Sequence, residues 1–287
     1  MVKRKRIPLL MVLPVLIYLF ALTIVPLVYM WVLSFSEYNL SRSEQMSFVG
    51  LRNYFDAFQD TEFYNSLTVT LIYVAAAVGI EFVLGFAIAL LLSKDFRGVG
   101  VFRTIIIMPM MCTPVVAGLV WRYIFSPEIG MANYLLSILK IPKLVWLGDP
   151  NLAVVSVVLV DIWQWTPFVV LVLIAGILSL PNEPYEAALI DGASSWQLFR
   201  YITVPLLRNV ILITVLLRVI DAFKIFDQIW VLTRGGPALR TEVLSIFIYR
   251  IGLRFFSMGR AAVLSIMMLF VVIGLSQILI ILIRRRA

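Results

Sequence analysis

Residues 183–205, EPYEAALIDGASSWQLFRYITVP, form the one long stretch of this chain that is neither membrane-like nor simply a charged tail. Two very apolar runs flank it. Local signals at its start predict a short helix that Asn182 caps, with Pro184 just inside the first turn. Gly192 is placed to end that helix in a left-handed conformation.

A second short helix is predicted after this turn. Ser194 and Gln197 have the spacing of a capping box, and Pro205 follows the helix. The stretch also carries more apolar residues than a solvated loop needs, namely Ala187, Ala188, Leu189, Leu198, Phe199 and Ile202. We therefore expect residues 183–205 to be a small two-helix knob that docks on another protein.

The composition of the chain places it outside the range of soluble domains. Of 287 residues, 62% are hydrophobic and 14% are charged, and the mean hydropathy is +1.01. These values predict an all-α polytopic membrane protein. The net charge of +8 comes from basic residues at the termini and beside apolar runs. There they set orientation in the lipid bilayer, so no nucleic-acid partner is expected.

The chain lacks the residues and motifs of catalytic and metal sites. It has no His and a single Cys, Cys112, inside an apolar run, so neither a disulfide framework nor a Cys/His metal site is expected. No GxSxG motif and no phosphate-binding loop is present. The chain is not expected to be an enzyme.

The apolar runs predict six transmembrane helices in one domain that covers residues 1–287, with residues 181–205 as a loop on the cytoplasmic side. The spans are expected at about 7–33, 67–92, 104–125, 152–180, 206–233 and 261–283. The first run is too long for a signal peptide. Basic ends and an even number of spans place both termini in the cytoplasm, although the last outer loop also carries several arginines. Residues 243–256 have helical spacing and either extend the sixth helix or lie at the outer interface.

Polar residues inside the fourth predicted span indicate a site. Asp161 lies ~15 Å from the outer end of this helix, near the middle of the bilayer, where an ionisable group needs a partner or a water-filled cavity. Gln164, Trp165 and Phe168 share its face. A stripe of acid, amide and aromatic rings suits a sugar, whose hydroxyls and C–H faces it complements. The alternative is that Asp161 pairs internally and that Trp163 and Trp165 only pack against other helices.

The fifth predicted span carries Arg218, Asp221, Lys224 and Asp227 at steps of three. Each can pair with its neighbour, which offsets part of the desolvation cost. The four cannot share one face; the face of Arg218 and Asp221 also holds Ala222, Ile225 and Gln228. We expect Asp161 and Arg218 to approach each other, or to flank one ligand, in mid-membrane.

The segment EAALIDGASSWQLFRYITVP resembles the EAA signature of binding-protein-dependent ABC importer permeases. FVGLRNY, FRTIIIMPMMCTPVVAGLVWRYIFSPEIGMANYLL, IWQWTPF and FDQIWVLTRGGP extend the similarity to carbohydrate permeases of the maltose and trehalose type. Val204 stands where Leu is usual, and Arg208 and Asn209 stand where a Pro is usual. The positions that match the signature are Glu186, Ala187, Ala188, Asp191, Gly192, Ala193, Phe199, Ile202 and Pro205.

The resemblance implies a permease subunit of an ATP-driven importer in a prokaryotic cell membrane, with a di- or oligosaccharide such as trehalose or maltose as substrate. It implies a second homologous permease, two ATPase subunits and an extracytoplasmic sugar-binding protein as partners. ATP and magnesium would bind the ATPase subunits, with no cofactor on this chain. The knob would be the coupling helix, with Glu186 paired to a basic residue of the ATPase.

The resemblance also implies which residues contact sugar, at positions matching Trp163, Trp165, Phe168, Arg218, Ala222 and Ile225. Ala222 and Ile225 are apolar here, so Arg218 and Asp221 are expected to replace them as contacts. An ion-coupled secondary transporter that uses Asp161, Asp221 and Lys224 as a relay is the alternative function, and an assembly subunit without a sugar site is another. The positive charge of Arg218 leaves a phosphorylated or acidic substrate open.

Overall fold

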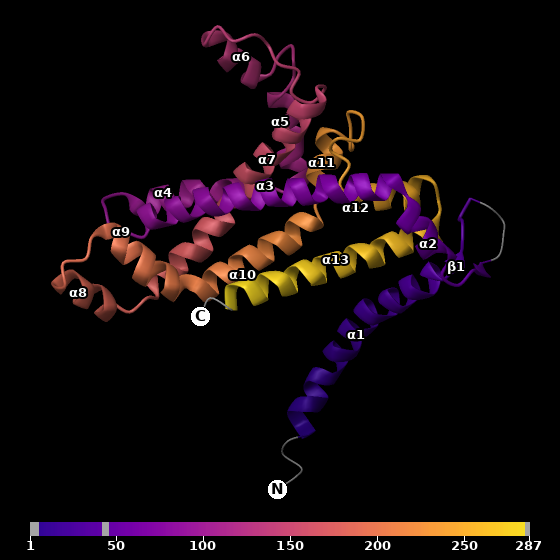
Figure 1. Cartoon of the computed structure of the whole chain (residues 1–287), viewed down its shortest axis with the longest axis horizontal. Helices are drawn as coiled ribbons and strands as arrows, with labels where there is room; N and C mark the ends of the chain where they lie inside the picture. Colours follow the sequence, from indigo (N-terminus) through magenta and orange to yellow (C-terminus); the bar gives the residue numbers. More distant parts are fainter. Residues whose placement is uncertain (1–5, 42–45, 285–287) are drawn as a thin grey trace. The chain divides into compact units, whose positions relative to one another are not determined.

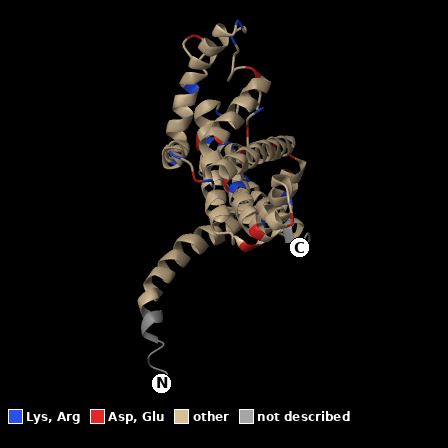
Figure 2. Cartoon of the chain, turned by 90° about the vertical axis from the view of Figure 1, so that its left-hand side faces the viewer, with Lys and Arg blue, Asp and Glu red and all other residues tan. Residues whose placement is uncertain are grey.

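The computed structural model describes residues 6–41 and 46–284, and most of them are helical (Figure 1). In this part of the chain, 5 helices are long and apolar enough to cross a membrane, and a bent pair brings the number to 6. Figure 2 shows no charged residue on the tan part of α1, and the sequence has none from Met11 to Ser34. The long helices are α1 (Arg6–Ser34), α3 (Thr61–Leu92), α7 (Pro150–Leu178), α10 (Val204–Phe223) and α13 (Met258–Arg284).

The chain divides into two compact units. The first contains Met1–Tyr64 and Phe247–Val271, and the second contains Asn65–Ile246 and Val272–Ala287. The knob and the polar residues of the fourth and fifth predicted spans all belong to the second unit.

A small antiparallel hairpin lies in the first unit, between α1 and α2 (Arg52–Gln59). Strand β1 (Ser36–Glu37) pairs with β2 (Ser47–Phe48). Asn53 of α2 donates to the backbone carbonyls of Ser34 and Ser36, which satisfies polar groups where α1 ends. The side chain of Asn53 therefore links α2 to the end of α1 and to strand β1.

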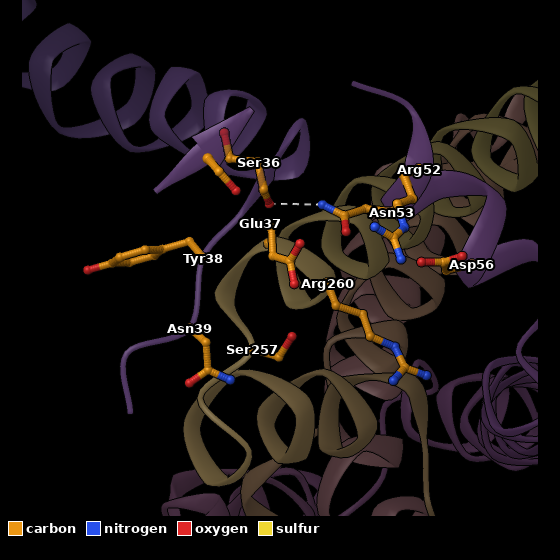
Figure 3. A pocket seen from close by; sticks show the side chains of 11 residues that line it. Ser36, Glu37, Tyr38, Asn39, Arg52, Asn53, Asp56, Ser257 and Arg260 are labelled. Carbon is orange, nitrogen blue, oxygen red and sulfur yellow. Dashed lines mark hydrogen bonds between the residues drawn. The ribbon is translucent and has the colours of Figure 1, made fainter. Parts of the chain in front are cut away.

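Ion pairs connect the two chain segments of the first unit. Arg260 contacts Asp60 at 2.5 Å and Arg250 contacts Glu62 at 2.7 Å. A polar cavity of about 590 Å³ lies beside them, lined by Ser36, Glu37, Tyr38, Asn39, Ser47, Arg52, Asn53, Asp56, Ser257, Gly259 and Arg260 (Figure 3).

The third predicted span, 104–125, is a bent pair of helices. Helix α4 (Val99–Ile107) and a 3-10 turn, η2 (Met108–Met111), are followed by α5 (Pro114–Ile124), and the two arms meet at 95°. Pro109 and Pro114 lack the N–H that a continuous helix needs at these positions. Beyond α5, α6 (Met131–Ile138) is a short helix.

The fifth predicted span, 206–233, has different limits in the structure. It begins earlier, because α9 (Ser195–Leu198) runs through a π-helical turn, η3 (Phe199–Thr203), into α10. It also ends earlier, because α10 stops at Phe223. A separate helix, α11 (Asp227–Leu232), follows after a break. Lys224 and Asp227 are thus not part of one continuous membrane helix.

Within residues 243–256, whose spacing indicates a helix, residues 244–254 are helical. Helix α12 (Leu244–Tyr249) continues into a π-helical turn, η4 (Arg250–Arg254), before α13 begins. Residues 255–257 are not helical, so α12 and η4 do not continue into α13 as one helix.

Candidate functional site

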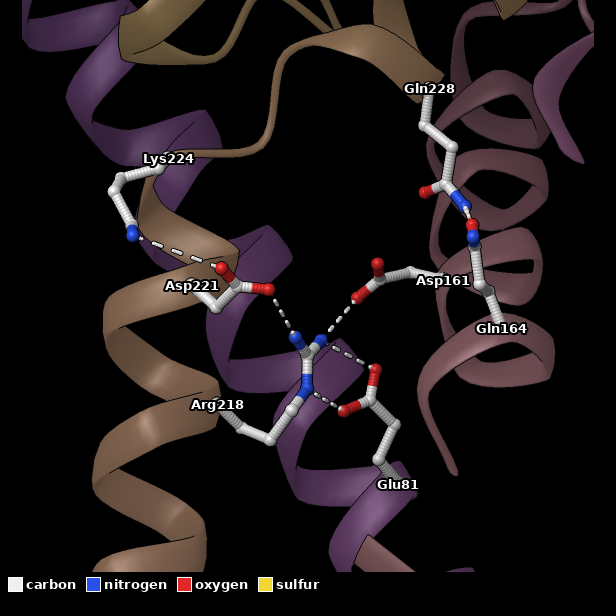
Figure 4. Close-up of polar contacts among 7 residues, drawn as sticks. All are labelled: Glu81, Asp161, Gln164, Arg218, Asp221, Lys224 and Gln228. Atoms are coloured by element: carbon white, nitrogen blue, oxygen red, sulfur yellow. Dashed lines mark hydrogen bonds and ion pairs between the residues drawn. The ribbon is translucent and has the colours of Figure 1, made fainter. Parts of the chain in front are cut away.

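The centre of the site is the guanidinium group of Arg218 in α10 (Figure 4). Its Nε lies 2.7 Å from Oε2 of Glu81, and its Nη2 lies 3.0 Å from Oε1 of the same carboxylate. Nη2 also donates to Asp161 at 2.9 Å. The exposed fractions of Arg218, Glu81 and Asp161 are 2%, 0% and 1%. The expected approach of Asp161 and Arg218 is confirmed as a buried ion pair, which is how buried charges are tolerated.

Glu81 is the residue that sequence reasoning missed. It lies in the middle of α3, within the apolar run TLIYVAAAVGIEFVLG. The signal was available, because one acidic residue inside a membrane helix needs a partner in the same way as Asp161 does. Glu81 supplies the bidentate contact of the cluster. Bidentate carboxylate–guanidinium pairs are among the strong hydrogen-bonded pairs in proteins.

The polar end of the cluster is accessible to solvent. Asp221 contacts Nη1 of Arg218 at 3.3 Å and Nζ of Lys224 at 3.8 Å. The side chains of Asp221 and Lys224 are 48% and 62% exposed. They lie at the edge of a pocket of about 300 Å³ that Trp165, Phe168, Leu217, Arg218, Ile220, Asp221 and Lys224 line.

An aromatic wall faces the charged residues of this pocket. The guanidinium carbon of Arg218 lies 5.1 Å from the ring centroid of Trp165, a cation–π contact that orients both groups. Trp165 and Phe168 are partly exposed. The pocket therefore combines flat apolar rings with a carboxylate and an ammonium group, as the stripe on the fourth span predicts for a sugar.

Gln164 has a different position from its neighbours on the predicted stripe. It is buried, donates to the backbone carbonyl of Cys112 at 2.8 Å, and accepts a hydrogen bond from Gln228 of α11. Cys112 lies between η2 and α5. Gln164 thus satisfies a carbonyl that the broken helix leaves without a helical partner, and it does not line the pocket.

Three other predicted contacts lie outside the pocket as well. The ring of Trp163 packs edge-on against Trp121 at 5.6 Å. Ala222 is buried, and the carbonyl of Ile225 accepts a hydrogen bond from Ser245. The structure thus brings Trp165, Phe168, Arg218 and Asp221 together at one pocket, with Asp161 behind them.

The knob at 181–205 consists of two short helices, as expected. Helix α8 (Glu183–Ile190) ends at a turn where Gly192 has φ +78°. The capping box between Ser194 and Gln197 is present. The expected cap by Asn182 is wrong, because its backbone is already helical and its side chain makes no capping hydrogen bond.

The knob presents apolar side chains to solvent. Ile190 is 87% exposed, and Leu189, Trp196 and Tyr201 are also exposed. Glu186, Ala187, Asp191 and Gly192 are exposed, while Ala188, Ala193 and Phe199 are partly buried. Phe199 contacts Phe86 of α3 with ring centroids 5.5 Å apart. Exposed apolar surfaces of this kind occur at sites of contact with other proteins or with the membrane.

Comparison with known proteins identifies relatives along most of the chain. The sequence model of the family described as "Binding-protein-dependent transport system inner membrane component" matches residues 81–286. The trehalose/maltose transport system permease protein MalF of Thermococcus litoralis is 37% identical over 240 residues, which cover 84% of this chain and 81% of that protein.

Two solved structures have the same fold. One is a bacterial ABC transporter involved in the import of the acidic polysaccharide alginate, with a TM-score of 0.85 and 22% identity over 99% of this chain and 97% of that one. The other is a bacterial alginate ABC transporter in complex with an alginate pentasaccharide-bound periplasmic protein, with a TM-score of 0.84 and 22% identity over 97% of this chain and 94% of that one.

Proposed function

The chain belongs to the family of binding-protein-dependent transport system inner membrane components, and on this premise we propose that it carries a di- or oligosaccharide such as trehalose or maltose. Members of this family are permease subunits of ABC importers and not catalytic enzymes. This chain accordingly forms part of the membrane path and couples it to ATP hydrolysis elsewhere.

The observation that carries the sugar proposal is the pocket beside Arg218. Aromatic rings of Trp165 and Phe168 offer flat apolar surfaces to the C–H face of a sugar ring. Asp221 and Lys224 offer an acceptor and a donor to sugar hydroxyls at the open edge. Such a combination of apolar walls with a few fixed polar groups is typical of small-molecule sites.

The proposal includes the partners of the subunit. A second, homologous permease completes the path, two ATPase subunits bind ATP and magnesium, and an extracytoplasmic protein delivers the sugar. Both termini lie in the cytoplasm, because both carry basic clusters. This orientation places the knob on the side where ATP is available.

The knob is the element proposed to contact an ATPase subunit. Its exposed Glu186 pairs with a basic residue of the ATPase, and the apolar residues around Ile190 occupy a groove there. Because α7 ends just before the knob and α10 follows it, a shift of the knob moves both helices that line the pocket. Rigid-body coupling of this type is a common mode of conformational switching.

Uptake by the complete transporter in proteoliposomes tests this function. We expect labelled trehalose or maltose to accumulate only with ATP on the ATPase side and with the binding protein on the other side. Uptake should persist when an ionophore collapses the proton gradient. ATP-independent uptake that the ionophore abolishes would instead support an ion-coupled transporter. An unchanged substrate range after Trp165→Ala would support a subunit without a sugar site.

A further inference from the structure

We infer that the carboxylates around Arg218 make this transporter selective for uncharged sugars and exclude saccharides that carry a carboxylate or a phosphate. The inference rests on the proposed function and specifies its substrate class. The fold alone leaves the charge of the cargo open, because a transporter of the same fold is involved in importing an acidic polysaccharide. The residues that line the path must therefore determine whether the cargo is neutral or charged.

The hydrogen-bonding capacity of Arg218 is almost fully used within the chain. A guanidinium group has five N–H donors. Nε and Nη2 donate to Glu81, Nη2 also donates to Asp161, and Nη1 donates to Asp221. A carboxylate or phosphate in the pocket would need two parallel donors for bidentate binding. Arg218 does not have two free donors to offer.

The charge of Arg218 is also cancelled where it lies. Glu81 contacts it in bidentate geometry, and Asp161 and Asp221 add two further carboxylates. Because Arg218, Glu81 and Asp161 are buried, water screens the charges among them only weakly. An anionic substrate would therefore approach carboxyl groups that already neutralise the guanidinium group, and it would find no unpaired positive charge there.

Lys224 does not reverse this balance. Its Nζ lies 3.8 Å from Asp221, so the accessible edge of the pocket holds one ion pair and no surplus positive charge. Within the described cluster, the two cationic residues Arg218 and Lys224 are accompanied by three acidic ones, Glu81, Asp161 and Asp221. Neutral sugar hydroxyls can form hydrogen bonds with Asp221 and Lys224 without electrostatic repulsion from the carboxylates. The pocket thus favours a neutral polyol over its acidic derivative.

Equilibrium binding to the complete permease–ATPase complex tests the inference. The delivery protein is left out, because its own specificity would mask that of the path. The probes are labelled trehalose and trehalose 6-phosphate, which differ by the anionic group. We expect the wild-type complex to bind trehalose at least tenfold more tightly than the ester.

Removal of one carboxylate should shift this preference. We expect Asp221→Asn to raise the affinity for the ester relative to trehalose about tenfold, because one negative charge beside the pocket is lost. Glu81→Gln should shift the ratio in the same direction by freeing donors of Arg218. Asp227→Asn is the matched control: it removes an exposed carboxylate of α11 that lies outside the cluster, and it should leave the ratio unchanged.

The possible results separate the inference from the proposed function. A wild-type complex that binds the ester as tightly as trehalose would overturn the inference, as would an unchanged ratio in both cluster variants. A complex that hydrolyses ATP but binds neither trehalose nor maltose would overturn the proposed function and the inference with it. Because Asp221 is half exposed, its variant remains informative if Glu81→Gln fails to fold.

Discussion

Two glycines set how closely α7 approaches its neighbours in the second unit. A Cβ added to Gly85 of α3 would lie 2.7 Å from Cγ1 of Val169, and one added to Gly176 of α7 would lie 2.9 Å from Cγ1 of Val210. Small residues allow membrane helices to approach this closely and to gain packing contacts. Both glycines therefore help to fix the helices that carry Glu81, Asp161 and Arg218.

We expect Gly85→Ala to destabilise the protein by about 1–3 kcal/mol, because the added methyl group collides with a rigid β-branched side chain. Thermal unfolding of the purified complex in detergent measures the effect. Gly79→Ala is the matched control, since it lies in the same helix and its added Cβ would meet nothing within 4 Å. Equal unfolding temperatures for the two variants would contradict this account of the α3–α7 contact.

The sequence was sufficient to predict the ion pairs of the cluster except the pair of Arg218 with Glu81. Asp161 and Arg218 each stood out in an apolar helix, and their similar depth predicted that they meet. Glu81 carried the same signal, but its depth along α3 indicates no particular partner, because depth alone does not say which helices are adjacent. The neighbours of α3 depend on contacts such as that of Gly85, which leave no periodic pattern in the sequence.

At the scale of elements, the turn at Gly192 decides whether the knob forms. Its φ of +78° is a conformation that side chains with a Cβ rarely adopt. We expect Gly192→Val to reduce copurification of the ATPase subunit at least fivefold, because the two short helices lose their relative orientation. Measurement is by affinity purification through the permease.

Gly98 provides a matched control for backbone strain. It also has a positive φ, +91°, and like Gly192 it has open space where a Cβ would be, but it lies outside the knob. Gly98→Val should therefore introduce similar backbone strain, and the ATPase subunit should still copurify with this variant. Equal loss of the ATPase in both variants would indicate general misfolding and would count against a docking role of the knob.

A second prediction at this scale concerns the break between η2 and α5. We expect Gln164→Leu to increase the rate of maleimide labelling of Cys112 severalfold, because the carbonyl of Cys112 loses its partner and the segment moves more freely. Cys112 is the single cysteine of the chain, so mass spectrometry of this subunit reports the site.

Thr166→Val, on the same helix as Gln164, is the control, because it removes a hydroxyl group without a hydrogen-bond partner in the described structure. It should leave the rate unchanged, whereas equal rates in all three proteins would contradict a role of Gln164 at the break.

The number of apolar runs and most of their positions were predictable, but the breaks within them were not. Pro167 lies inside α7, which continues through it, whereas Pro109 and Pro114 lie at a 95° bend. A proline in a membrane helix is compatible with either outcome, because neighbouring helices can satisfy the freed backbone groups. At the bend, Gln164 of another helix satisfies one of them, and that contact is not visible in the local sequence.

At the scale of the whole molecule, the knob contacts a third helix besides α7 and α10. Phe199, in the turn that enters α10, contacts Phe86 of α3 at 5.5 Å, and Phe86 stacks on Phe82 at 5.7 Å. Because α3 also carries Glu81, a shift of the knob would reach the charge cluster by two routes, through α10 to Arg218 and through α3 to Glu81. Movement of only one of these helices would separate the bidentate pair, whose rupture in a buried site costs several kcal/mol.

We therefore expect Phe86→Ala to lower the amount of sugar imported per ATP hydrolysed about two- to tenfold, the range that the loss of one aromatic pair implies. Assembly with the ATPase should persist, because Phe86 is not part of the exposed surface of the knob. Parallel measurement of uptake and phosphate release in proteoliposomes gives the ratio. Phe96→Ala, which removes a ring packed on Phe102 outside the knob, should leave it unchanged. An unaltered ratio in Phe86→Ala would show that α3 is not driven through this contact and that motion reaches the cluster through α7 and α10 alone.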